Sequence, residues 1–130
     1  MLRPLRLRNL WLSGGAVALA VILGLSLMPL KDPMPFQIRD KLAHFAAFSF
    51  LTVWFLGIVD AGGRLRIACA LAAYGLGIEL LQSLTALRTA DPLDVVSDLA
   101  GIAAGWYLAA AGLHQWCFRL ESWFGVAPDE

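Results

Sequence analysis

Five polar side chains interrupt the long apolar stretches of this 130-residue sequence, and their types suit acid–base chemistry. They are His44, Glu79, Gln82, Asp94 and Asp98. Glu79 and Gln82 are three residues apart and Asp94 and Asp98 four apart, so on helices each pair would share one face. An imidazole and a carboxylate can transfer protons near neutral pH. We therefore predict that His44 and Glu79 form a catalytic acid–base pair. Asp98 and Gln82 would orient this pair.

Charged residues near these side chains are candidates for binding a ligand. Asp40 and Lys41 come one helical turn before His44, and Arg88 follows the third apolar stretch. Lys41, Arg39 and Arg88 could meet a phosphate or carboxylate, which arginine can do through two parallel hydrogen bonds. The predicted ligand-binding residues are Asp40, Lys41, Gln82, Arg88, Asp94 and Asp98.

A metal site is an alternative use of the same side chains, because one imidazole and three carboxylates suit a divalent ion. That set would be His44, Glu79, Asp94 and Asp98, but its spacing is not diagnostic of any metal. We therefore predict no metal site, and the sequence identifies no cofactor.

The composition places these polar residues in a membrane. Apolar residues make up 59% of the chain and charged residues 15%, against about 45–50% and about 25% in ordinary soluble domains. Ten basic residues balance ten acidic ones, which argues against a nucleic-acid partner. Four stretches approach the roughly 20 residues that a helix needs to cross a bilayer. They run from about 10 to 28, 42 to 59, 65 to 87 and 93 to 113.

The spans predict an all-α polytopic membrane protein, with a four-helix transmembrane bundle as a single domain. Short connections between the spans favour up-and-down topology. Residues 114–124 would form a short C-terminal helix along the membrane interface. Four tryptophans near span ends would anchor the chain at the interfaces, and these are Trp11, Trp54, Trp106 and Trp116.

The spans also bring the polar side chains to one depth. At about 1.5 Å of rise per residue, Asp98 lies roughly 9 Å from Pro92 and Glu79 roughly 12 Å from Leu87. His44 lies one turn into the second span. Charges at this depth cost at least a few kcal/mol each on insertion scales, so we expect these side chains to face the bundle interior.

Some of these carboxylates have a simpler interpretation as helix caps. Asp40 precedes the second predicted span and could accept hydrogen bonds from backbone N–H groups as an N-cap. Asp91 or Asp94 could do the same for the fourth span. Asp98 is too deep in its span to act as a cap.

Glycines on the fourth span predict close helix packing. Gly101 and Gly105 continue the face of Asp98, and small residues there let another helix approach. We favour packing within the chain over dimerisation, with Gly75 and Gly77 of the third span serving the same contact. An oligomer is possible but not indicated.

Basic residues near the span ends predict the orientation, because Lys and Arg resist translocation. Six of them lie on the side of the termini, namely Arg3, Arg6, Arg8, Arg64, Arg66 and Arg119. Four lie on the other side, namely Lys31, Arg39, Lys41 and Arg88. We therefore expect both termini in the cytoplasm and the polar layer near the outer surface.

Three motifs follow one another along the chain. They are Asp40-Lys41-x-x-His44-Phe45, then Glu79-x-x-Gln82 with Arg88, then Asp94-x-x-x-Asp98-x-x-Gly101-x-x-x-Gly105. In order and spacing this pattern resembles the VanZ-like family of small bacterial membrane proteins over about 26–105, although the family usually has Asn where this chain has Asp98. The resemblance implies the bacterial cytoplasmic membrane and a link to low-level resistance to the glycopeptide teicoplanin. It implies no reaction, because the family's biochemical activity is not settled.

Together these features predict an outward-facing polar pocket within the membrane. It would bind, and could process, a cell-envelope lipid or a lipid-linked precursor. The alternative is a non-catalytic membrane protein whose buried polar layer only fixes helix packing. Proton-coupled transport is less favoured, because the polar residues do not continue through the inner half of the spans.

Overall fold

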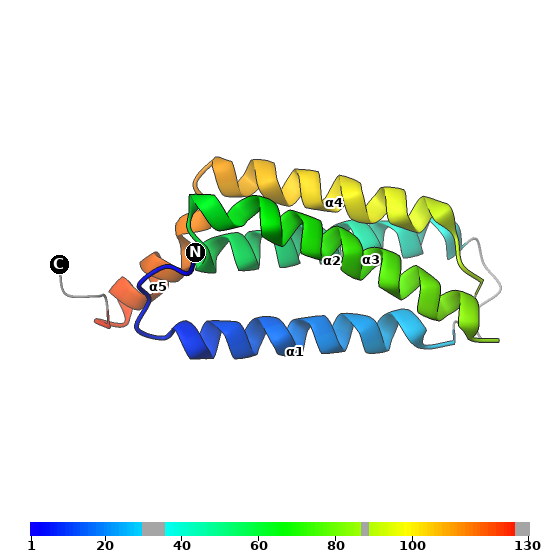
Figure 1. Cartoon of the computed structure of the whole chain (residues 1–130), viewed down its shortest axis with the longest axis horizontal. Coiled ribbons are helices and arrows are strands. Elements are labelled where there is room, and N and C mark those ends of the chain that lie inside the picture. The colour runs from blue at the N-terminus through cyan, green and yellow to red at the C-terminus, as the bar shows by residue number, and fades with distance from the viewer. Residues whose placement is uncertain (30–35, 87–88, 127–130) are drawn as a thin grey trace.

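Helices form most of the chain (Figure 1), whose computed structural model describes residues 1–29, 36–86 and 89–126. The elements are α1 (Arg8–Leu27), α2 (Phe36–Ile58), α3 (Arg64–Leu84), α4 (Pro92–Ala110) and α5 (Trp116–Trp123), with 3-10 turns at Ala61–Gly63 and Leu113–Gln115. Within the described ranges no strand forms, and the one bridge of extended backbone joins Leu2 to Val59. The predicted all-α fold is confirmed.

All four long helices are long and apolar enough to cross a membrane. Large apolar side chains such as Val17, Leu80 and Leu99 are exposed on their outer faces. A helix that exposes apolar residues is stable when lipid rather than water surrounds it. The chain thus has the helices of a multi-pass membrane protein, as the sequence predicted.

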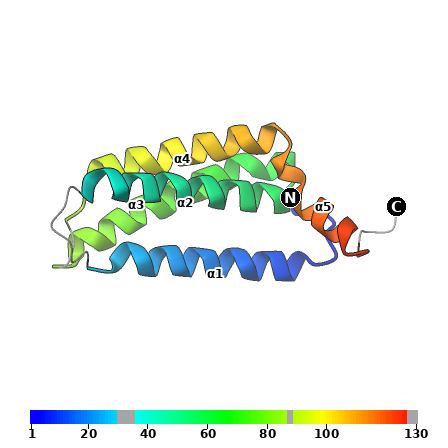
Figure 2. The ribbon, with the colours of Figure 1, turned by 180° about the vertical axis from the view of Figure 1, so that it is seen from behind.

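Successive long helices run in opposite directions, with α1 along one side of the bundle and α4 along the other (Figures 1 and 2). We call the end where α1 and α3 finish and α2 and α4 begin the polar end. The opposite end, where the N-terminal segment and α5 lie, is the terminal end. The apolar core between the helices includes Phe48, Leu51, Leu71, Ile78 and Ile102.

The helix α2 begins earlier than its apolar stretch does. The sequence placed the start near residue 42, whereas the helix starts at Phe36, so Arg39, Asp40 and Lys41 lie inside its first turns. The prediction that Asp40 caps this helix is therefore wrong. An added polar turn keeps its backbone hydrogen bonds within the helix and needs no apolar side chains.

The helix α4 begins where the sequence indicates. Asp91 is its N-cap, and its side chain accepts a hydrogen bond from the Leu93 N–H at 2.9 Å. Pro92 occupies the first turn, where its missing N–H costs no hydrogen bond. Of the two caps proposed for this helix, Asp91 is confirmed, and the carboxylate of Asp94 is left to make other contacts.

Tryptophans gather at the terminal end. The Trp116 ring lies 5.1 Å from Trp11 and 4.6 Å from Trp54, centre to centre. A Cβ on Gly57 would overlap the Trp116 ring, so only glycine leaves room for this ring. Three of the four tryptophans predicted as interface anchors thus also pack against one another and fix α5 to the bundle.

Candidate functional site

A buried contact between a histidine and a carboxylate joins α2 to α4 at the polar end. His44 Nδ1 lies 2.8 Å from Asp98 Oδ1, and the two residues are 5% and 1% exposed. The other oxygen, Asp98 Oδ2, has no hydrogen-bond partner and faces Gly75, whose Cβ position is 2.5 Å away. The sequence placed these residues at one depth, and the structure brings them into direct contact.

Two more carboxylates, those of Asp40 and Asp94, lie close to His44. His44 Nε2 lies 4.0 Å from Asp94 Oδ2, which is beyond hydrogen-bond range. Potential ligand atoms of Asp40, His44 and Asp94 all lie within 4.8 Å of one another. Nδ1 is therefore held by Asp98, while Nε2 is the ring nitrogen on the side of Asp94.

Lys41 connects the same cluster to the start of α4. Its Nζ lies 2.6 Å from Asp91 Oδ2 and 3.4 Å from Asp94 Oδ1. The hydrogen bond from Lys41 lowers the pKa of the Asp91 carboxyl below its ordinary value. Lys41 therefore already neutralises two protein carboxylates and is not free to bind an anion. The sequence reasoning noticed Asp91 only as a cap and missed this second role.

Glu79 lies beside the cluster but is not paired with His44. Its Oε2 accepts a hydrogen bond from the Asp91 N–H at 3.0 Å, and its buried Oε1 has no partner within the described part of the chain. Asp94, Asp98 and His44 are close enough to act on it electrostatically. The predicted acid–base pair thus shares one layer without a hydrogen bond between its members.

Gln82 makes its contact with α1. Its Nε2 donates to the Ser26 carbonyl at 2.8 Å, and its Oε1 is buried without a hydrogen bond. The sequence predicted Gln82 as an orienting partner of Glu79. No hydrogen bond joins these two side chains among the described residues, so Gln82 instead ties α3 to α1.

Two of the cations predicted to bind a phosphate or carboxylate, Arg39 and Arg88, are still to be placed. Arg39 is exposed in the first turns of α2. Arg88 lies outside the described residues, so its predicted place at the site is not tested. Among the residues that the structure describes, carboxylates therefore outnumber the cations at this end.

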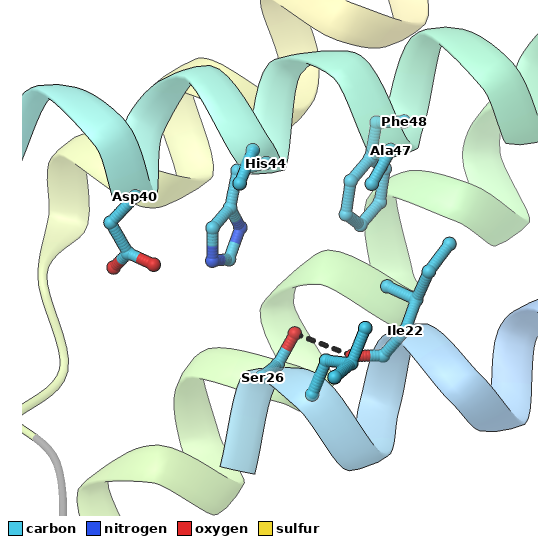
Figure 3. Close-up of a pocket in the computed structure, with 8 residues that line it drawn as sticks. Ile22, Ser26, Asp40, His44, Ala47 and Phe48 are labelled. Carbon is cyan, nitrogen blue, oxygen red and sulfur yellow. Dashed lines mark hydrogen bonds between the residues drawn. The ribbon is translucent and has the colours of Figure 1, made fainter. Parts of the chain in front are cut away.

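A cavity of about 240 Å³ adjoins the cluster between α1 and α2. Figure 3 shows the Asp40 and His44 side chains projecting from α2 towards Ser26 of α1, with Phe48 and Ala47 further along α2. The polar lining residues are Ser26, Asp40 and His44, and the apolar ones are Ile22, Leu25, Ala43, Ala47 and Phe48. The contribution of α1 could not be found from the sequence, because that helix carries no charged or amide residue near the polar end.

Small residues bring α4 against α2 and so place Asp98 beside His44. A Cβ on Gly101 would lie 2.5 Å from the Phe45 carbonyl oxygen, and one on Gly105 would lie 2.6 Å from that of Ser49. A Cβ on Gly75 would lie 3.2 Å from the Phe48 ring and 2.5 Å from Asp98 Oδ2. Gly77 has nothing within 4 Å, so its predicted part in this contact is wrong.

Comparison with known proteins places the chain in a family. The VanZ/LLP1 family model matches residues 6–114, which is most of the sequence. The chain belongs to the VanZ/LLP1 family. An uncharacterized protein of the fission yeast Schizosaccharomyces pombe is 38% identical over 72 residues, covering 52% of this chain and 44% of that protein. This chain therefore aligns with less than half of its yeast relative's length. Similarity reaches a eukaryote, so the family resemblance does not imply a bacterial source. No solved structure matches.

Proposed function

We propose that this VanZ/LLP1 family member binds the polar head of a membrane lipid, or of a lipid-linked envelope precursor, at the polar end of the bundle. The observation that carries the proposal is the cavity between α1 and α2. One part of its lining offers a hydroxyl, a carboxylate and an imidazole, and the rest is aliphatic or aromatic. An amphiphile with a polar head and a hydrocarbon tail matches this division.

In this proposal the polar end faces the outside of the cytoplasmic membrane, with both termini in the cytoplasm. Arg39 and Arg88 would meet a phosphate of the head, since Lys41 is held by Asp91 and Asp94. His44 and Glu79 would exchange protons with the head if it is processed, with Asp98 holding the ring of His44. The teicoplanin resistance associated with the family would follow from binding an envelope component at this surface.

The test is lipid retention measured by native mass spectrometry on the purified chain. Ala43→Leu adds a larger side chain to the cavity wall, and we expect the number of retained lipids to fall at least threefold. Ala46→Leu is the matched control, because Ala46 is an exposed alanine on the same helix outside the cavity lining. Equal lipid retention in the wild type and both variants would overturn the proposal.

A structural role is the second candidate, and one observation favours it. The polar contacts of the cluster join different helices: His44 to Asp98, Lys41 to Asp94, and Gln82 to the Ser26 carbonyl. His44→Ala and Glu79→Gln separate the two candidates. Loss of the folded state with unchanged lipid content favours the structural role, and normal thermal stability with lost lipid favours the binding site.

A further inference from the structure

The environment of His44 resembles that of a metal-binding histidine. Its Nδ1 is held by Asp98 Oδ1 at 2.8 Å. Metal-binding histidines commonly direct one ring nitrogen at the ion while the other donates to a carboxylate, which fixes the ring and raises its basicity. Here the carboxylate of Asp98 is in place, and Nε2 is the nitrogen left for an ion.

The second ring nitrogen of His44 lies near the carboxylate of Asp94. His44 is only 5% exposed, and its Nε2 makes no hydrogen bond within the described residues. The 4.0 Å between Nε2 and Asp94 Oδ2 is too long for a hydrogen bond. A single metal ion bonded to Nε2 and to Oδ2 at about 2.0–2.2 Å each would fit between these two atoms. One potential ligand atom from each of Asp40, His44 and Asp94 lies within 4.8 Å of the other two, so an ion between them would have three protein ligands.

The negative charge of the cluster also favours a bound cation. Asp94, Asp98 and Glu79 lie around His44, and among the described residues Lys41 contacts this set through Asp94 Oδ1 at 3.4 Å. This contact leaves Asp94 Oδ2 facing the histidine. Buried carboxylate charge is costly in a low-dielectric interior, and a divalent ion beside Asp94 would offset it.

We propose that Asp40, His44 and Asp94 bind one divalent transition-metal ion, with Asp98 as the positioning residue behind His44. One nitrogen and two carboxylate ligands suit Zn²⁺ or Mn²⁺ better than Mg²⁺, which prefers an all-oxygen shell. Asp40 and His44 also line the cavity, so coordination positions not filled by protein would face it. The inference deepens the proposed function, because the ion would meet the phosphate of a lipid head or a free phosphate. It opposes the prediction of no metal, which rested on sequence spacing alone.

The first experiment measures metal binding by the full-length chain in detergent. Protein treated with a chelator and dialysed is titrated with Zn²⁺, and bound metal and the midpoint of thermal unfolding are recorded. We expect about one high-affinity Zn²⁺ per chain and a higher midpoint, with a much smaller effect of Mg²⁺ at the same concentration. No binding, or equal stabilisation by both ions, would overturn the inference.

Variants locate the ion. Asp40→Asn changes a half-buried ligand and is the variant expected to fold, and it should weaken Zn²⁺ binding at least tenfold. Its control is Asp60→Asn, at an exposed carboxylate of the terminal end. His44→Ala should remove the site, whereas His114→Ala, at the other histidine, should bind Zn²⁺ as the wild type does. Asp98→Asn should weaken binding about 10- to 100-fold, as loss of such a partner typically does. Unchanged affinity in Asp40→Asn and His44→Ala would place the metal elsewhere and overturn the inference.

Two further arms separate this inference from the proposed function. Lipid retention is measured on chelator-treated protein with and without Zn²⁺, and inorganic phosphate replaces lipid in a parallel Zn²⁺ titration. Lipid retained by a wild type that binds no Zn²⁺ overturns the metal site and leaves the proposed function intact. Zn²⁺ bound at His44 without any lipid retention supports the metal site and overturns the proposed function. An effect of phosphate on Zn²⁺ affinity identifies free phosphate as a sufficient ligand.

Discussion

At the scale of single residues, the contact between His44 and Asp98 gives a direct prediction for the stability of Asp98 variants. Both groups are buried, so replacing Asp98 with leucine leaves Nδ1 without an acceptor, which typically costs about 1–3 kcal/mol. Asp98→Asn keeps a carbonyl that can accept from Nδ1–H and should cost clearly less. Thermal unfolding followed by circular dichroism in detergent measures both. If the leucine variant is as stable as the asparagine variant, the contact does not hold His44.

The Asp91 carboxyl gives a pH dependence with a definite sign. Its pKa is lowered in the folded chain by the hydrogen bond from Lys41, relative to an unfolded value of about 3.9. The stabilisation is therefore fully present above about pH 4 and is lost as the pH falls through the folded-state pKa. Asp91→Asn keeps an N-cap side chain but loses the charge.

We therefore expect Asp91→Asn to be less stable than the wild type at pH 7, with a difference that shrinks as the pH is lowered below about 4. Chemical unfolding at a series of pH values measures this difference. A difference that stays constant down to the lowest pH would show that the charge of Asp91 makes no contribution.

At the scale of elements, the contact between α2 and α4 depends on two glycines. Leucine at Gly101 would place atoms against the Phe45 carbonyl, a backbone group that cannot move aside, so we expect a loss of at least about 2 kcal/mol. Gly77→Ala is the control, because its Cβ meets nothing and alanine favours helix by up to about 1 kcal/mol. Equal unfolding midpoints for the two variants would rule out close packing at Gly101.

The elements also show what the sequence could and could not predict. Hydropathy located all four long helices, because crossing a membrane requires long apolar stretches. It misplaced the start of α2, since the turn holding Asp40 and Lys41 is helical without being apolar. Spacing of three and four residues brought Asp94 and Asp98 to one face, but it could not say that Lys41 reaches α4. Contacts between helices depend on how each helix is rotated about its own axis. A stretch that is apolar on all sides does not determine this rotation.

A buried contact at the terminal end was likewise not predictable from the sequence. Glu121 is fully buried and accepts hydrogen bonds from the Arg6 and Leu7 N–H groups and from Trp11 Nε1 at 2.8–3.1 Å. The sequence offered no signal for this role, because a glutamate in an amphipathic helix ordinarily faces solvent. Glu121 instead fixes α5 to the start of α1, far from the polar end (Figure 1).

At the scale of the whole molecule, the up-and-down topology would put the polar end and the terminal end on opposite sides of a membrane crossed by the four long helices. With Cys69→Ser as background, Ala86→Cys and Ser122→Cys report on the two ends, both at exposed positions. Burial raises the pKa of the remaining Cys117 thiol to about 12, so it should stay unreactive. We expect a membrane-impermeant maleimide to label Ala86→Cys on intact cells, and Ser122→Cys only after permeabilisation. The reverse pattern would contradict the proposed orientation.

The most direct test of the account maps where a lipid head contacts the chain. A phospholipid with a photoreactive group in its head is added to the purified protein, and cross-linked peptides are identified by mass spectrometry. The account predicts cross-links concentrated around Ser26 and the stretch from Asp40 to Ala47, which are lost in Ala43→Leu and kept in Ala46→Leu. Cross-links spread evenly over the exposed faces of all four long helices would contradict it.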